Sequence, residues 1–208
     1  MNDTFTYAHR VKFDLFLKYG YIAAAGDRHL AEFCDGKQYM QSSEQIKEWM
    51  FGLTTVEWRK NNLKQRMERS EKLASGEEPV AIKITGEEGV EQMRAILGLR
   101  ELVTNVNMPN YGQIPNLPLG AVVETNAIFN DGNVTPVFSG AIPDTIYPLI
   151  SRIAGEQELI AEAGNKRDLD LAFTAFISDP LTTVDAKTAR VLFDEMVDNT
   201  KEYLKEYF

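Results

Sequence analysis

The sequence predicts an α+β domain with helices around a small antiparallel sheet. Helical patterns occupy the first and last parts of the 208 residues, and one hairpin pattern lies between them. Strand and helix patterns do not alternate along the chain, as they would in a doubly wound parallel sheet. Because a chain of this length can bury a core of its own, we expect residues 1–208 to form a single domain.

The first part of the chain is expected to form two helices separated by a loop. Residues 5–19 place their apolar side chains on one side of a helix, and Gly20 suits its end. Residues 20–41 are rich in glycine and other small residues, which predicts a loop with one short helical turn. Ser42 or Ser43 is the expected cap of the next helix.

A long polar helix and a shorter amphipathic helix are expected next. Thr54 and Glu57 have the spacing of a capping box, so a helix should run from there to about Leu73. Glutamates interrupt its basic residues, which favours a solvated helix surface over a nucleic-acid patch. Residues 87–97 carry apolar side chains at helical spacing, which predicts the second helix.

The middle of the chain combines an irregular segment with a hairpin. Residues 102–106 are a short strand candidate. Residues 105–120 hold three prolines, two glycines and four asparagines, which excludes a regular helix. An apolar strand at 121–129, an Asp-Gly turn at 130–133 and a strand at 134–138 together predict a β-hairpin.

The last third of the chain is predicted to be helical. One helix should span residues 143–163 and a second residues 168–177. Asp179 and Pro180 then interrupt the pattern, and Asp185 is placed to cap a final amphipathic helix.

Composition limits the classes of function that the chain can have. Its net charge of −9, from 31 acidic and 22 basic residues, argues against a general polyanion or nucleic-acid binder. The single cysteine, Cys34, allows no intrachain disulfide and is expected to be a small buried apolar residue. No signal-peptide core or membrane span is recognisable, so we expect a soluble cytoplasmic protein. The sequence also lacks the glycine-rich fingerprints GxGxxG and GxxxxGK[ST] of nucleotide sites.

The segment from Gly26 to Phe33 is the first candidate site. Asp27, Arg28, His29 and Glu32 bring two carboxylates, an imidazole and a guanidinium onto one small-residue loop. Such groups can transfer protons and bind an anion. The alternative is a surface loop in which Asp27 caps a short helix and Arg28 pairs with Glu32.

The proline- and asparagine-rich segment from Asn105 to Glu124 is the second candidate. Irregular segments of this length are uncommon unless they are functional, and asparagine can both donate to and accept from sugar hydroxyls. In the alternative interpretation, Glu124 points to solvent from an alternating strand and the asparagines form local turns.

Four segments together resemble a known enzyme family, glycoside hydrolase family 4. They are YGYIAAAGDRHLAEF (19–33), NVNMPNYGQIPNLPLGAVVETNAIF (105–129), PVFSGAIP (136–143) and AFISDPL (175–181). Their order matches the galacturonidase-like branch of the family, and the resemblance runs from about residue 5 to the C-terminus. It implies a C-terminal domain like that of lactate and malate dehydrogenases, which closes the substrate site of an enzyme whose N-terminal Rossmann domain binds NAD.

The resemblance also implies a reaction and its cofactors. Family members depart from the usual two-carboxylate hydrolysis. NAD takes a hydride from C3 of the sugar, a divalent metal, usually manganese, polarises the sugar oxygens, and a base removes the C2 proton. The aglycone then leaves, water adds, and the hydride returns.

By resemblance, particular residues acquire expected roles. Asp27 stands where the family places its base, and Arg28 and His29 are expected to bind the carboxylate and hydroxyls of the substrate. Asn107, Asn110 and Glu124 match motif positions and are further substrate-binding candidates. Because Asp-Arg-His replaces the tyrosine of the phosphosugar enzymes, the resemblance favours a uronic acid or an unmodified α-glycoside.

The family's metal-binding cysteine and histidine lie upstream of the matched region, so we expect this chain to hold neither NAD nor Mn²⁺ by itself. It would be the substrate-side part of an α-galacturonidase-like enzyme, inactive alone, homo-oligomeric, and completed by a Rossmann domain. A natural split protein, a truncated gene and a cloned fragment all remain open. The alternatives are a non-catalytic oligomerisation or sugar-binding remnant, and a complete hydrolase that pairs Asp27 with Glu32 or Glu124.

Overall fold

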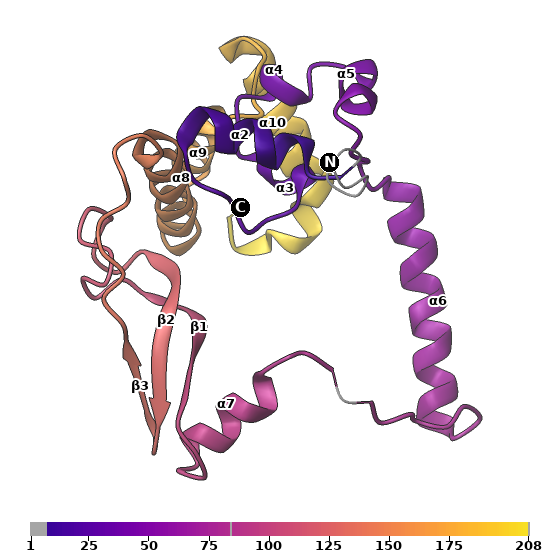
Figure 1. Ribbon diagram of the computed structural model, residues 1–208. Helices are drawn as coiled ribbons and strands as arrows, with labels where there is room; N and C mark the ends of the chain where they lie inside the picture. Colours follow the sequence, from indigo (N-terminus) through magenta and orange to yellow (C-terminus); the bar gives the residue numbers. More distant parts are fainter. Residues whose placement is uncertain (1–7, 84, 208) are drawn as a thin grey trace. The chain divides into compact units, whose positions relative to one another are not determined.

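The computed structural model describes residues 8–83 and 85–207, and Figure 1 shows its helices and strands. Among the described helices, α6, α8 and α10 are long, and the others have ten residues or fewer. The described elements include a three-stranded sheet in the order β1-β2-β3, with helices before and after it in sequence, which confirms the α+β prediction. Chain contacts define two compact units. The first unit comprises Met1–Phe51, Val103–Ile128 and Thr135–Phe208, and the second Gly52–Leu102 and Phe129–Val134.

From residue 8 on, the described part of the first unit begins with the helices α2 (Arg10–Tyr19), α3 (Asp27–Glu32), α4 (Gly36–Tyr39) and α5 (Ser43–Glu48). The prediction of one helical turn within residues 20–41 is wrong, because α3 and α4 both form there. Each is too short to be stable alone, and tertiary contacts and caps hold such helices. Ser42 caps α5 as predicted, since its side chain accepts a hydrogen bond from the Gln45 amide.

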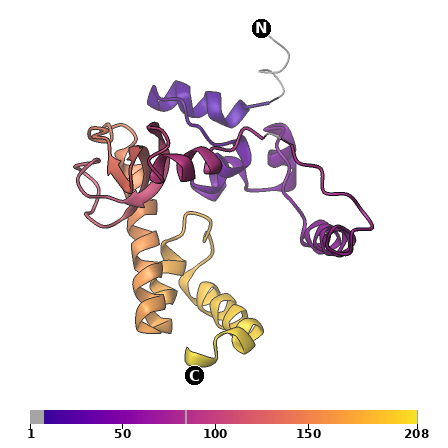
Figure 2. The same cartoon turned by 90° about the horizontal axis from the view of Figure 1, so that it is seen from below.

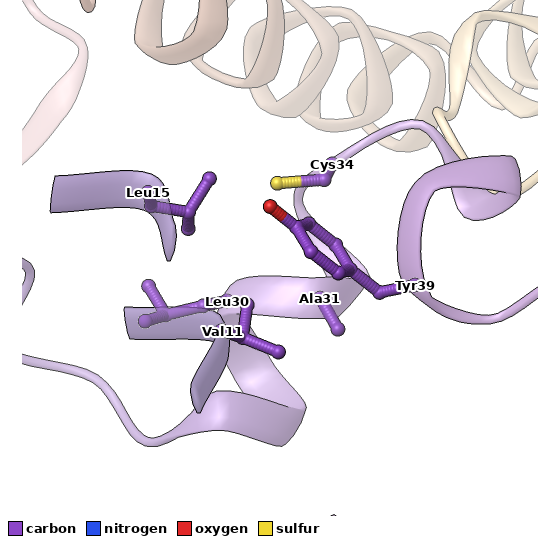
Figure 3. Packing of buried hydrophobic residues seen from close by; sticks show 6 residues of the cluster. All are labelled: Val11, Leu15, Leu30, Ala31, Cys34 and Tyr39. Carbon is purple, nitrogen blue, oxygen red and sulfur yellow. The ribbon is translucent and has the colours of Figure 1, made fainter. Parts of the chain in front are cut away.

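A compact apolar cluster joins α2, α3 and α4, as Figure 3 shows. Its six members are Val11, Leu15, Leu30, Ala31, Cys34 and Tyr39. Burying a Val or Leu side chain contributes about 1.5–3 kcal/mol, so a few such side chains hold short helices together. Cys34 is only 2% exposed, and burial raises the pKa of its thiol, as expected of a small buried residue.

The second unit contains the long helix α6 (Val56–Ser75) and the helix α7 (Gly89–Ile96). The predicted cap Thr54 is wrong by one residue, because the side chain of Thr55 accepts the Trp58 amide hydrogen bond. Gly98 has φ +71°, and a Cβ there would meet a carboxylate oxygen of Asp131 at 3.0 Å. Glycine therefore lets the chain turn beside the hairpin tip after α7.

The sheet consists of β1 (Leu102–Pro109), β2 (Val122–Asn130) and β3 (Asn133–Pro136). Along β2, exposed and buried residues alternate at every position, which is the period-two pattern of a half-buried strand. Asp131 and Gly132 both have positive φ, 43° and 79°, so the predicted Asp-Gly hairpin turn is confirmed.

The first unit ends with the helices α8 (Tyr147–Lys166), α9 (Leu169–Ser178) and α10 (Ala186–Thr200), which are prominent in Figure 2. Two short 3-10 turns, η1 (Lys201–Tyr203) and η2 (Lys205–Tyr207), follow them. The side chain of Asp185 accepts hydrogen bonds from two amides of α10, which confirms the predicted cap. Among the helices of the described residues, none combines the length and apolar character that a membrane span needs.

Candidate functional site

The first unit contains a hollow of about 520 Å³, here called the α3 hollow. It lies among α2 and α3, the segment after β1, strand β2 and helix α8. Its walls are mainly apolar and aromatic; they include Tyr19, Tyr21, Phe33, Ile114, Leu117 and Glu124. Concave sites of this size with few polar groups are where small molecules usually bind.

Asp27, the expected base, lies at the start of α3 and contacts the first turn of α2. The Val11 amide donates to its Oδ2 at 3.0 Å, and the Lys12 amide donates to its Oδ1 at 3.1 Å. His9, at the N-cap of α2, gives no side-chain cap, so Asp27 supplies the acceptors that this helix end needs. The alternative in which Asp27 caps its own helix is wrong, because Gly26 stands at the N-cap of α3.

Arg28, His29 and Glu32 form a chain of contacts on α3. His29 Nδ1 lies 3.1 Å from Glu32 Oε2, and Arg28 Nη2 lies 3.4 Å from His29 Nε2. A neutral imidazole protonated at Nδ1 satisfies both contacts, because Nδ1 then donates and Nε2 accepts. The imidazole is exposed, so a ligand can reach it.

A polar network joins the helices on either side of α3 in sequence. The hydroxyl of Tyr39 donates to Asp14 Oδ2 at 2.5 Å, and Lys18 Nζ contacts both Asp14 and Tyr39. Burial raises the pKa of Asp14, but the hydrogen bonds from Lys18 and Tyr39 outweigh it, and the net pKa is lowered. Burial and then the Asp14 carboxylate raise the pKa of Tyr39, so its hydroxyl stays a donor. The network ties α2 to α4.

Asn110 organises the irregular segment that follows β1. Its side chain is 1% exposed, and its Nδ2 donates to the carbonyl oxygens of Ile114, Leu117 and Pro118 at 2.9–3.1 Å. Its Oδ1 accepts hydrogen bonds from the amides of Gly112 and Ile114. The loop backbone thus occupies the amide group of Asn110, and its expected role in substrate binding stays a prediction.

Asn107 and Glu124 lie on neighbouring strands, and both are exposed. Glu124 lines the α3 hollow, and Asn105 Nδ2 donates to its Oε1. Asn105 begins the second candidate segment but was given no role of its own. It lies two positions from Asn107, so the two share one face of β1, and this spacing is the signal that indicates their common side.

The predicted site residues are therefore brought together only in part. Glu124 lines the α3 hollow, and Leu30 and Phe33 reach its walls from α3. The lining residues in the described part of the chain include neither Asp27 nor Arg28, His29, Asn107 or Asn110. The hollow thus contacts the helix that carries the expected base, while the base itself faces α2.

The described residues offer no site that fits the cofactors implied by the resemblance. Within residues 8–83 and 85–207, no three His, Cys, Asp or Glu side chains are grouped so that they could hold a metal ion. The sequence carries no glycine-rich fingerprint for a dinucleotide either. Residues that bind NAD and Mn²⁺ are accordingly not assigned within this chain.

Three comparisons place the chain among known proteins. It is 59% identical over 204 residues to an α-galacturonidase of Thermoanaerobacterium saccharolyticum, covering 98% of this chain and 44% of that protein. Its fold matches a crystal structure from Bacillus subtilis, of lplD, named as a glucosidase, with TM-score 0.83 and 48% identity over 90% of this chain and 42% of that one.

A more distant match shows the fold alone. It is a 6-phospho-α-glucosidase from gut microorganisms in complex with NAD and Mn²⁺, with TM-score 0.61 and 22% identity over 80% of this chain and 38% of that one. The chain thus spans less than half the length of these proteins. Residues 1–182 match the family model of the family 4 glycosyl hydrolase C-terminal domain. The chain therefore belongs to the family 4 glycosyl hydrolases, through the C-terminal domain of that family.

Proposed function

We propose that this chain is the substrate-side part of an α-galacturonidase-like enzyme that works with NAD and Mn²⁺. The observation that carries the proposal is the 59% identity to an α-galacturonidase over 98% of this chain. The redox-assisted elimination remains a prediction from the family, and we derive no step through NAD or the metal from these residues.

In this proposal, Asp27 is the base that accepts the C2 proton of the sugar. A carboxylate offers about four lone-pair sites, and the amides of Val11 and Lys12 use one on each oxygen. The remaining lone pairs can accept a proton, while the two amides hold the carboxylate in a fixed orientation. Orientation of this kind is what proton transfer at carbon requires.

The remaining predicted residues would bind the sugar. Arg28 supplies a guanidinium for a uronate carboxylate, and His29 a donor or acceptor for hydroxyls. Glu124, oriented by Asn105, would accept hydroxyl hydrogens at the edge of the α3 hollow. The apolar walls of that hollow suit the C–H face of a sugar ring or an aglycone.

Complementation tests the proposal. The N-terminal part of the T. saccharolyticum enzyme, mixed with this chain, NAD, Mn²⁺ and an α-galacturonide, should release galacturonate. Asp27→Asn should lower the rate by about 10²-fold or more, and Glu48→Gln, an exposed carboxylate on α5, should leave it unchanged. No turnover from a complex whose assembly is confirmed by sizing would count against the proposal. NAD-free turnover by the chain alone would favour a conventional carboxylate pair.

A second candidate is a non-catalytic module that assembles copies of the chain. It is favoured by helix α6, on which Trp58, Leu63 and Met67 are each more than half exposed and which has no buried residue. Multi-angle light scattering over a range of concentrations tests it. A strict monomer that binds no galacturonate would remove this candidate.

A further inference from the structure

The first unit contains a second hollow, of about 630 Å³, here called the α10 hollow. Its walls come from α8, α9, α10, the loop after α9 and the C-terminal turns. It shares no lining residue with the α3 hollow: Glu156 and Ile160 of α8 line one, and Ile153 and Gln157 line the other. Two separate hollows therefore use different faces of the same helix.

The α10 hollow is mainly apolar, with Thr182, Thr183 and the Tyr207 hydroxyl as its uncharged polar groups. Its walls include Phe176, Leu192, Phe193 and Val197, and the carboxyl groups of Glu156 and Asp179 interrupt them. Glu156 is 9% exposed, and its Oε2 is buried without a hydrogen-bond partner in the described residues. A buried carboxylate oxygen with no donor is unfavourable, so this atom is suited to receive one.

The charged groups near Glu156 leave its carboxyl open to a cation. Burial raises the pKa of Glu156, the charge of Asp179 and a hydrogen bond between the two carboxyl groups raise it further, and the charge of Arg152 opposes them. The guanidinium of Arg152 donates to the Ser178 carbonyl oxygen at 2.8 and 3.2 Å, and Asp179 Oδ1 accepts the Leu181 amide. Among the described lining residues, Tyr207 is the other titratable group, and its hydroxyl donates to the Gly164 carbonyl oxygen.

We propose that the α10 hollow binds a small organic cation, an ammonium group on an apolar body, through Glu156 and Asp179. The ammonium hydrogens would donate to Glu156 Oε2 and the Asp179 carboxyl, and the apolar body would lie against Phe176, Leu192 and Phe193. A hollow of about 630 Å³ falls within the usual range for small-molecule sites, which is about 300–1,000 Å³.

The test is a calorimetric titration of the 208-residue chain with phenethylammonium chloride and, separately, with phenethyl alcohol. The two probes share their apolar body and differ in charge, so their comparison isolates the carboxyl pair. We expect the ammonium to bind at least about tenfold more tightly than the alcohol at neutral pH. Matched sodium chloride controls for ionic strength.

Two variants of α8 separate a specific site from general attraction to an acidic protein. Glu156→Gln should weaken binding of the ammonium about tenfold or more. Glu158→Gln removes the same charge from an exposed position two residues away and should leave the affinity unchanged. If Glu156→Gln does not fold, Asp179→Asn serves the same purpose.

Amide NMR of the wild-type chain decides the outcome even if no variant folds. Binding in the α10 hollow should shift signals of Ile160 and Val197 and leave Ile150, which lines the α3 hollow, unshifted. The proposal is overturned if neither probe binds at about millimolar concentration, if the two bind equally, or if the shifts map to the α3 hollow.

Discussion

The carboxylate of Asp27 links α3, which carries it, to α2, whose first-turn amides donate to it. Helix α2 follows His9, an N-cap residue with φ 72° whose side chain makes no cap hydrogen bond. Asp27, which lies 15 and 16 positions after the amides that it accepts from, thus caps the start of α2. No local sequence pattern predicts a cap from so far along the chain. A catalytic and a structural role for Asp27 are compatible, and mutation can separate them.

Asp27→Ala should lower the free energy of unfolding by about 1–2 kcal/mol, because both amide hydrogen bonds at the start of α2 are lost. Asp27→Asn should cost less, since its amide oxygen keeps an acceptor there. Urea unfolding followed by circular dichroism measures both, with the exposed Asp144→Asn as control. Equal stability of wild type and Asp27→Ala would show that α2 does not depend on this cap.

Glu156 predicts a pH dependence of stability with a defined sign. Its pKa in the folded state is raised above the usual 4.5 by burial and by Asp179. The folded state therefore binds its proton more tightly than the unfolded state does. This contribution to stability is full below pH 4.5 and is lost as pH rises through the raised pKa.

Glu156→Gln keeps the shape of the side chain and removes its titration. The variant should gain melting temperature relative to wild type at neutral and alkaline pH, and this gain should shrink toward pH 4.5. Calorimetric melting of both proteins across this range provides the measurement, with Glu158→Gln as control. A gain that does not vary with pH would contradict the raised pKa.

At the scale of elements, the segment from Asn110 to Gly120 shows how a loop without regular structure is held. Asn110 alone satisfies three carbonyl oxygens and two amides of this segment. A buried polar network of this kind is costly to break, because each group left behind is unsatisfied. The segment is thus ordered by one side chain rather than by a repeated backbone pattern.

Asn110→Ala should destabilise the protein by about 3 kcal/mol or more, because several buried polar groups lose their partner together. Asn110→Asp should be harmful too, since it places a carboxylate oxygen against carbonyl oxygens. Asn107→Ala, at an exposed position of the preceding strand β1, should stay within about 0.5 kcal/mol of wild type. Thermal melting provides the comparison, and similar losses for both alanine variants would argue against the network.

The helix ends show which caps can be predicted from residues that are close in sequence. Asp185 and Ser42 were predicted as caps and serve as caps, because a side chain bonding two or three residues ahead is a local interaction. Thr55 replaces the predicted Thr54, a one-residue shift within the normal uncertainty of helix ends. The sequence predicted one helical turn where both α3 and α4 form, because contacts with α2 stabilise these short helices.

At the scale of the whole molecule, the chain spans 44% of the length of the T. saccharolyticum α-galacturonidase that it matches. Its described residues group no metal ligands, and its sequence has no dinucleotide fingerprint. We expect titration calorimetry of the chain with NAD to show no binding tighter than about millimolar, with or without Mn²⁺. A micromolar affinity would place a cofactor site within these residues.

The sequence by itself determined the α+β class, the hairpin, the caps of α5 and α10, and the family. These features depend on short-range periodicity, turn chemistry and motif order, which residues close in sequence express. Only the tertiary structure decided that Asp27 completes α2, that Asn110 is occupied by its own loop, and that Glu156 is a buried carboxyl in an apolar hollow. Hydrogen-bond partners and burial depend on contacts between residues that are distant in sequence. The local sequence pattern does not show which of these residues come into contact.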